Sequence, residues 1–483
     1  MTISRYLFSA ALLTLFLGTV AAKSPRKDVQ RCGLEYLESN FSTYDALHKR
    51  IHGFAEPGYQ EYRSSETLAA FLEERDFVLE RGVAEIPTAF VATYGSGHPV
   101  IGLLAEFDAL PGLSQDTVAY RKPLEDRSYG HGCAHNLLGT ADVAAGVAIA
   151  HFLKNSGLGG TVKVYGCPAE EGGGGKAYMT MAGCFDDCDV IFDWHPDLRN
   201  EVSLSPGLAN VGAKFTFHGT PAHASDDPWD GRSALDAVQA FNLMIEMMRE
   251  HIPTDARIHY VITDGGKAPN IVPERAQVYY YFRHPKGSEA KKILERAVKA
   301  AEGAALGTGT TMEYELIHGN YEKLVIKSLS EIFQRNLLKV GGLDLDEREK
   351  GFLRDIMEAS GIRDTEEGLR RFTEVQPSIV PAVPGGSSTD VGSVSQVVPL
   401  AQLAVSTTIV GIHSWQQTAI GGTTIGTKAL LNVAKVFYLS AVEIYTDPGK
   451  LTPIRSEFES IQGPHPEFIP LMGYRKPPLD YRN

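Results

Sequence analysis

Two short stretches of the sequence gather side chains that are able to bind metal ions. The stretch GHGCAHN, residues 130–136, places the thiol of Cys133 two positions before the imidazole of His135. Further along the chain, PAEEGGGGK carries adjacent carboxylates at Glu170 and Glu171, followed by four glycines. A thiolate together with imidazole ligands favours zinc, while manganese, cobalt and nickel remain possible. These types and spacings indicate a metal-dependent hydrolase.

Two distant histidines complete the candidate ligand set. His195 in DWHP and His413 in VGIHSWQQ each follow a run of residues that is typical of a strand. A lone histidine at a strand end is more often a surface or core residue. With Cys133, His135 and Glu171, however, the two histidines supply the five ligands that two divalent metal ions and a bridging water need. Coordination would also keep the Cys133 thiol ionised.

The adjacent carboxylates predict a division of labour. Neighbouring residues of an extended chain point in opposite directions, so Glu170 and Glu171 cannot bind one ion as a symmetric pair. We expect Glu171 to hold metal while Glu170 acts as general base on the attacking water and passes the proton to the departing amine. Four glycines, Gly172 to Gly175, would let the backbone turn away without crowding the pocket.

Two alternatives stay open at this point. Cys133 is either a metal ligand, a simple buried apolar group or the nucleophile of a cysteine hydrolase paired with a histidine. A non-catalytic protein could instead use the same cleft for binding, although such a protein has no use for Glu170. The sequence contains no HExxH, G-x-S-x-G or Walker A motif, so these rival hydrolase and phosphate sites are excluded.

Composition and the chain ends narrow the setting. The 483 residues, 43% hydrophobic and 22% charged, are ordinary for a soluble enzyme of two or three domains. A net charge of −13 argues against nucleic-acid binding. Residues 1–22 have the pattern of a signal peptide, so we expect secretion. No other segment is long and apolar enough for a membrane span, and Cys184 and Cys188 are close enough in sequence to form a disulfide.

The elements that must position these residues alternate between strands and helices. This rhythm predicts an α/β domain with a mostly parallel sheet, in two parts at residues 23–209 and 319–445. Between them, residues 210–318 read β-α-β-β-α-β, a ferredoxin-like lid or dimerisation domain. Residues 446–483 form a tail that is rich in Pro and Tyr and has no clear periodicity. The candidate ligands, and Asp108, follow strand ends, where open α/β sheets bind ligands.

Seven motifs in order carry a family resemblance: AEFDALPGLSQ, GHGCAHNLLG, PAEEGGGGK, DWHP, GTPAHAS, APNIVPERA and GGSSTDVGSVS. From Tyr44 to Tyr445 the chain resembles the amidohydrolase branch of the aminoacylase/carboxypeptidase metallopeptidase family. The resemblance implies hydrolysis of the amide between an acyl or aminoacyl group and a free amino acid. It also implies a catalytic base at Glu170 and metal ligands at the following positions: Cys133, His135, Glu171, His195 and His413.

The same resemblance implies roles beyond the ligand set. Asp108 matches a carboxylate that orients a metal ligand. His223 matches a lid histidine that reaches across a homodimer and stabilises the oxyanion of the reacting carbonyl. Asn270 matches a lid residue near the substrate, and Arg283 a residue that binds a substrate carboxylate, unless it forms only a surface salt bridge. The implied partners are a small amide or dipeptide substrate and a second copy of the chain.

Overall fold

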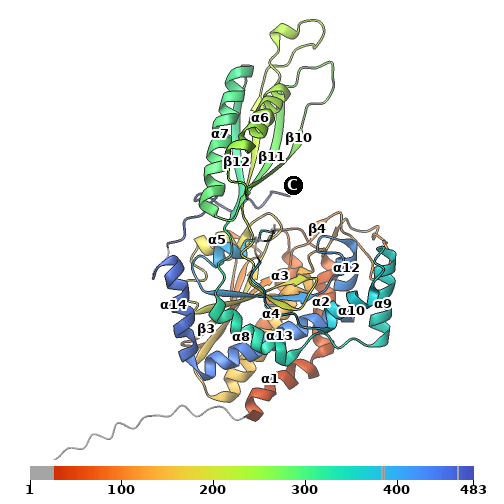
Figure 1. The fold of residues 1–483 in the computed structure, drawn as a ribbon, viewed down its shortest axis with the longest axis vertical. Coiled ribbons are helices and arrows are strands. Elements are labelled where there is room, and N and C mark those ends of the chain that lie inside the picture. Colours follow the sequence, from red (N-terminus) through yellow and green to blue (C-terminus); the bar gives the residue numbers. More distant parts are fainter. Residues whose placement is uncertain (1–26, 382–384, 386, 465–466, 483) are drawn as a thin grey trace, which may run out of the picture.

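The computed structural model describes residues 27–381, 385, 387–464 and 467–482. The predicted signal peptide, residues 1–22, lies outside these described residues. They form a large α/β domain, here the catalytic domain, and a smaller α/β domain that projects from it (Figure 1). The predicted fold class is therefore confirmed.

The catalytic domain is built on a sheet of seven strands in the order β1-β2-β6-β3-β7-β13-β8. Its four central strands run parallel: β6 (Gly160–Cys167), β3 (Val100–Glu106), β7 (Val190–Asp197) and β13 (Leu400–Ser406). Its outer strands pair antiparallel: β1 (Val78–Arg81), β2 (Phe90–Ser96) and β8 (Glu201–Ser203). Every residue of β3 and β13 is buried, as expected for strands covered on both faces. The mostly parallel character thus belongs to the centre of the sheet.

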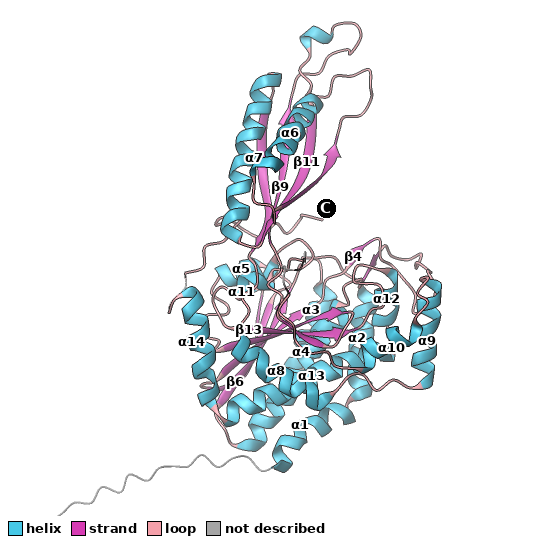
Figure 2. Cartoon of the chain, in the orientation of Figure 1, coloured by secondary structure: helices cyan, strands magenta, loops and turns pink. Residues whose placement is uncertain are grey.

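Two long helices dominate the core of this domain, α4 (His135–Ser156) and α13 (Thr424–Thr446). Contrary to the expectation from sequence, both are long and apolar enough to cross a membrane by length and composition. Their apolar windows are 94% and 78% buried inside the fold, which accounts for the composition by core packing. Figure 2 shows them among the helices that surround the sheet.

The remaining helices of the catalytic domain are shorter. They are α1 (Lys27–Ser39), α2 (Phe41–Phe54), α3 (Tyr62–Glu73), α5 (Gly175–Met181), α8 (Lys327–Val340), α9 (Glu347–Ala359), α10 (Thr365–Thr373), α11 (Val391–Val394), α12 (Trp415–Gly421) and α14 (Leu451–Gln462). Short strands β4 (Leu110–Pro111) and β5 (Tyr129–Gly130) form a separate ribbon. The tail therefore contains a helix, α14, although its sequence lacks a clear period.

The inserted domain, here called the lid, follows the predicted β-α-β-β-α-β order. Its elements are β9 (Ala209–His218), α6 (Ala234–Met248), β10 (Arg257–Asp264), β11 (Arg275–His284), α7 (Gly287–Thr308) and β12 (Thr311–Asn320). The strands form an antiparallel sheet in the order β10-β11-β9-β12. Alternate residues of β11, such as Tyr280 and Phe282, are buried in the core that includes α6 and α7. The opposite face carries Tyr279, Tyr281 and Arg283.

All five cysteines are free thiols. Cys184 and Cys188 are therefore not bridged, and Cys188 instead lies 3.1 Å from the hydroxyl of Tyr165. Cys167 is buried at the end of β6 and packs in a core cluster of the catalytic domain. Cys133 is the thiol that lies among candidate metal ligands.

Candidate metal centre

The Cys133 and His135 side chains are brought together by a strained turn. Ala134 between them has φ +53°, in the left-handed region that costs a non-glycine residue about 1 kcal/mol or more. His135 then begins α4, so the helix fixes its position. The Nδ1 atom of His135 lies 2.8 Å from Asp108 Oδ1. This contact leaves the Nε2 atom to face the centre, which is the orienting role expected for Asp108.

Glu170 and Glu171 follow the end of β6, but they do not lie in extended chain as expected from the sequence. They occupy a turn that begins at Ala169, another non-glycine residue in the left-handed region at φ +57°. The backbone N–H of Glu171 donates to Asp108 Oδ2 at 3.0 Å. Both carboxylates line one cavity because the turn, rather than strand alternation, sets their directions.

The other two candidate ligands, His195 and His413, come from later parts of the chain. His195 lies near the end of β7, with Nε2 3.4 Å from Cys133 Sγ. His413 precedes α12 in the left-handed region at φ +60°, and its N–H donates to Gly132 O at 2.7 Å. Its Nε2 lies 3.1 Å from Glu171 Oε1. The backbone bond to Gly132 explains how so distant a residue reaches the Cys133 turn.

The ligand atoms cluster in two overlapping groups. Cys133, His135 and His195 form one group, and Cys133, Glu171 and His413 form another, with all ligand atoms of a group within 4.8 Å of each other. Within the described residues, the buried atoms His135 Nε2 and Glu171 Oε1 accept or donate no hydrogen bond. Each has one group at ion-pair distance, Glu106 for His135 and His413 for Glu171. Buried polar atoms without a hydrogen bond are costly, so these residues would suit a pair of metal ions with Cys133 in common.

Burial and charge shift the pKa values of the reactive groups in opposite directions. Burial would raise the pKa of the Cys133 thiol, but the nearby His195 and His135 outweigh it and lower the pKa to about 6. Burial, reinforced by Glu106 and Glu171, raises the pKa of the Glu170 carboxyl well above its usual range. The protein alone thus prepares a thiolate, while the carboxyl at Glu170 is a strong proton acceptor whenever it is ionised.

A buried ion network beneath the ligands was missed by the sequence reasoning. Glu106 Oε2 lies 3.1 Å from His135 Nε2, without hydrogen-bond geometry, and Glu106 Oε1 lies 2.5 Å from Lys176 Nζ. Lys176 also contacts Asp390 Oδ1 at 2.7 Å, and all three side chains are buried. Glu106 joins His135 and Glu170 in a third group of potential ligands. The available signal was their place inside three of the quoted motifs.

The ligands open into a cavity of about 570 Å³ between the catalytic domain and the base of the lid. Arg283 lines the same cavity, with its guanidinium 5.6 Å from the Tyr281 ring. Half-burial lowers the pKa of this guanidinium, chiefly by desolvation. Arg283 therefore lies at the cavity that holds the candidate ligands, and its binding of a substrate carboxylate stays a prediction.

His223 and Asn270 are not brought to this cavity. They occupy two loops at the far end of the lid, residues 219–233 and 265–274, here called the distal loops, where both are exposed. Ala224 N donates to Asn270 O at 3.0 Å, so the two loops contact each other. Arg283 pairs with Asn210 at the base of the sheet and Arg275 pairs with His218 at its far end. The eight residue steps from Arg283 to Arg275 along β11 place the distal loops about 26 Å beyond Arg283.

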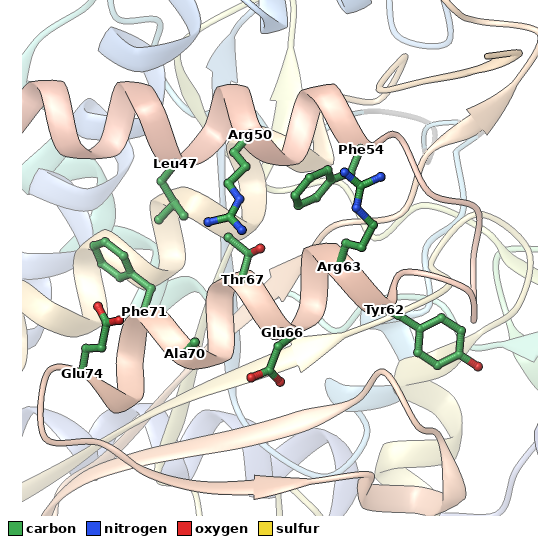
Figure 3. Close-up of a pocket in the computed structure, with 10 residues that line it drawn as sticks. All are labelled: Leu47, Arg50, Phe54, Tyr62, Arg63, Glu66, Thr67, Ala70, Phe71 and Glu74. Atoms are coloured by element: carbon green, nitrogen blue, oxygen red, sulfur yellow. The ribbon is translucent and has the colours of Figure 1, made fainter. Parts of the chain in front are cut away.

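A second cavity of similar size, about 560 Å³, lies between α2 and α3. Figure 3 shows Phe54 with the Arg63 guanidinium against it, 3.9 Å from the ring centre, beside Arg50 and Glu66. None of the candidate ligands lines this cavity. The chemistry of the chain therefore points to the cavity at the base of the lid.

Comparison with known proteins places this geometry. Residues 209–309 match the family model of a peptidase dimerisation domain. The chain is 36% identical over 460 residues to one of the subunits of p-aminobenzoyl-glutamate hydrolase from Escherichia coli (strain K12), covering 90% of this chain and 96% of that protein. It is 29% identical over 446 residues to the Xaa-Arg dipeptidase of Mus musculus, covering 89% and 92%. A dinuclear metal-binding peptidase of the M20 family from Bacillus subtilis has the same fold, with a TM-score of 0.56, 17% identity and coverage of 85% and 99%.

A split α/β catalytic domain, a ligand set of this kind and an inserted dimerisation domain together define a metal-dependent hydrolase. The chain belongs to the M20 family of metallopeptidases and amidohydrolases. The family resemblance carried by the seven motifs is thereby confirmed. Its amidohydrolase or peptidase activity and its metal dependence follow from this membership.

Proposed function

We propose that the protein hydrolyses the amide bond between an acyl or aminoacyl group and a free amino acid. Two divalent cations, zinc by the chemistry of the thiolate and imidazole ligands, would polarise the carbonyl and lower the pKa of water between them. Cys133 would be shared, with His135 and His195 on one side and Glu171 and His413 on the other. The observation that carries the proposal is the pair of overlapping ligand groups beside Glu170.

The residues of this chain divide the remaining tasks. Glu170 accepts the proton of the attacking water and returns it to the departing amine, since it lines the cavity in the turn that also carries Glu171. Asp108 orients His135 through Nδ1. Arg283, at the lid side of the same cavity, suits a carboxylate of the substrate because its guanidinium offers a planar fork of donors. A free amino acid as the leaving group supplies that carboxylate.

The oxyanion donor would come from a second copy of the chain. His223 and Asn270 cannot serve their own cavity from the distal loops, so the lid of a partner would deliver them as a homodimer forms. Edge strand β10 supports this proposal because Val261 and Ile262 are 56% and 40% exposed, and Leu243 and Met247 on α6 are 58% and 62% exposed. Such an apolar edge suits pairing with its own copy.

The dimer is tested by a charge placed on that edge. Val261→Lys should convert the protein from dimer to monomer in light scattering coupled to size exclusion. Leu306→Lys is the matched control, because Leu306 is an 86% exposed lid residue on α7, away from β10. A wild-type monomer, or a dimer that survives Val261→Lys and separates with Leu306→Lys, contradicts pairing through β10.

The activity is tested with purified protein, elemental analysis and a panel of N-acyl amino acids and dipeptides. We expect about two divalent metal ions per chain, hydrolysis of at least one carboxylate-bearing amide, and loss of both after chelation. Activity should return with zinc, manganese, cobalt or nickel. Hydrolysis that persists in metal-free protein would reject the proposal.

The 3.4 Å contact between Cys133 Sγ and His195 Nε2 favours a second candidate, a cysteine hydrolase. The same experiment separates the two. A cysteine nucleophile is inactivated by a thiol alkylator even when metal is bound, and a chelator leaves it active. A metal centre is inactivated by the chelator and protected from alkylation by bound metal, because the thiolate is then coordinated.

We also propose that the protein is secreted, on the strength of the sequence pattern in residues 1–22. Expression of the full chain should release a product that begins after Ala22. N-terminal sequencing of protein from the medium tests this, and an intact N-terminus retained inside the cell would contradict it.

A further inference from the structure

The last described part of the chain, residues 467–482, is here called the strap. It crosses the junction between the two domains, near the end marked C in Figure 1. Leu471 is 4% exposed in the core of the lid, while Met472 is 2% exposed in a core cluster of the catalytic domain. Tyr321, just after β12, donates its hydroxyl to Ile469 O at 2.8 Å. The strap is therefore anchored in both domains.

The end of the strap contacts the backbone of a metal ligand. Tyr481 donates its hydroxyl to Glu171 O at 3.1 Å, and the Arg482 guanidinium donates to the same oxygen. The Tyr481 ring packs edge to face on Tyr59, with 5.6 Å between ring centres. Tyr59 in turn donates to Gly173 O at 2.8 Å. Two donors on one carbonyl oxygen hold Glu171 from outside its own loop.

This support lies at the glycine-rich part of the site. Four glycines follow Glu171, and Gly172 and Gly174 have φ +95° and +70°, conformations that glycine adopts among many others. The N–H of Glu171 is fixed by Asp108, as described above. Its C=O, the hinge into the glycine run, is fixed by the strap. Without that second point the carboxylate direction depends on a backbone with low intrinsic preference.

We propose that Tyr481 and Arg482 are positioning residues for the divalent cation held by Glu171 and His413. They act through the Glu171 carbonyl and keep the carboxylate aimed into the cavity. The inference rests on the proposed function insofar as that function assigns Glu171 to metal. It adds a requirement: an intact strap is part of the metal site, and the ion between Cys133, His135 and His195 depends on it less.

The test measures metal affinity directly, by zinc competition with a chromophoric chelator on the full chain. Arg482→Ala combined with Tyr481→Phe should weaken one of two ions about 10- to 100-fold, the range for residues that orient a ligand. The other ion should bind as in wild type. Tyr481→Phe alone keeps the ring packing and should give a smaller loss, and Arg482→Lys should restore part of the affinity because it keeps a donor.

The strap itself offers matched controls. Lys476 pairs with Glu85 at 2.7 Å and Arg475 with Glu315 at 3.3 Å, both away from Glu171. Lys476→Ala and Arg475→Ala should leave both metal affinities unchanged. Equal weakening by these controls, or two wild-type affinities in the double variant, overturns the positioning role.

The outcomes also separate this inference from the proposed function. A wild-type chain that binds two ions but hydrolyses nothing in the panel rejects the function, while the titration still decides the role of the strap. A chain that binds no metal rejects both.

Discussion

The cavity at the base of the lid and the distal loops contrast in how completely they are built. Around the cavity, the ligands are fixed by strained turns, by Asp108 and by buried ions such as Lys176. In the distal loops, His223 is exposed. Its hydrogen bonds are to Asp227, Ser225 and Asp226, and its backbone bridges to Ile271 of the other distal loop. The candidate ligand set of the cavity is supplied by a single chain, whereas the distal loops carry polar residues that lie away from that cavity.

The difference supports the proposed division of catalytic tasks between two copies of the chain. Metal ligands must converge within tenths of an ångström, so they are held by one rigid domain. A lid residue that contacts the reacting carbonyl can come from another chain, provided that the interface fixes its approach. In the proposed dimer the lid would serve two cavities: its base would close its own through Arg283, and its distal loops would complete the partner's.

The largest expected effect concerns the cavity at the base of the lid. Glu170→Gln should lower kcat by at least ~10³, the upper part of the range for loss of a general base, because the amide cannot accept the proton. The variant should still bind two metal ions. Glu201→Gln is the matched control, since Glu201 lines the same cavity and belongs to none of the ligand groups, and it should keep nearly full kcat. Near-wild-type turnover in Glu170→Gln would reject its role.

The next largest effect is expected in the distal loops. His223→Ala should lower kcat by about 10²- to 10³-fold, as for loss of an oxyanion donor, with metal content unchanged. His218→Ala, an exposed histidine of β9 paired with Glu313, is the control and should be close to wild type.

Mixing the two inactive variants shows where His223 acts. Co-refolded Glu170→Gln and His223→Ala protomers should recover about a quarter of wild-type activity, since half the dimers are mixed and each mixed dimer has one intact composite site. No recovery in a mixture that contains mixed dimers would mean that His223 does not act in trans. The contrast between the two regions would then fail.

A smaller effect is expected where the lid meets its own cavity. Arg283→Ala should raise KM about 10- to 100-fold, the worth of a hydrogen-bonded charge, for substrates whose leaving group has a free carboxylate. With the corresponding carboxamide as substrate, the KM of the wild type should rise by the same factor. The variant should have similar KM values for the carboxylate and the carboxamide. Arg275→Ala, at the distal end of β11 and paired with Asp264, should change neither value. An unchanged KM in Arg283→Ala would remove the base of the lid from substrate binding.

The sequence was sufficient for the parts of the fold and site that depend on local pattern. Strand ends predicted where the candidate ligands would gather, and the rhythm of residues 210–318 predicted the β-α-β-β-α-β order of the lid. His413 was proposed from its place at a strand end and from the number of ligands that two ions need, but nothing in VGIHSWQQ reveals its backbone bond to Gly132. The expectation that Glu170 and Glu171 lie in extended chain was wrong. Ala169 has a backbone in the left-handed region, and the two glutamates lie in the turn that it begins.

The rest could not be predicted because it depends on contacts between distant residues. Lys176 and Asp390 are 214 positions apart, and their pairing has no local signature. The contact of Tyr481 with Glu171 spans 310 positions and comes from a tail without periodicity. The proposed homodimer needs a second chain, so the role that the family resemblance implies for His223 stays a prediction.

The smallest expected effect concerns protein stability and the packing that supports the cavity at the base of the lid. His52 of α2 donates through Nε2 to Thr418 O of α12 at 2.9 Å and stacks on His131, so it joins the supports of the Cys133 and His413 turns. Burial lowers its pKa to about 4, against about 6.5 in an unfolded chain. Between these values the unfolded chain takes up a proton that the folded chain refuses, so stability falls as the pH falls from 6.5 toward 4. At pH 5 this loss is about 2 kcal/mol.

His52→Gln keeps a donor for Thr418, and its free energy of unfolding should fall less between pH 7 and pH 5 by about that amount. Denaturant unfolding of the metal-free protein at both pH values measures this difference. If the free energy of unfolding falls equally between pH 7 and pH 5 in the two proteins, the packing under the turns tolerates a charged His52.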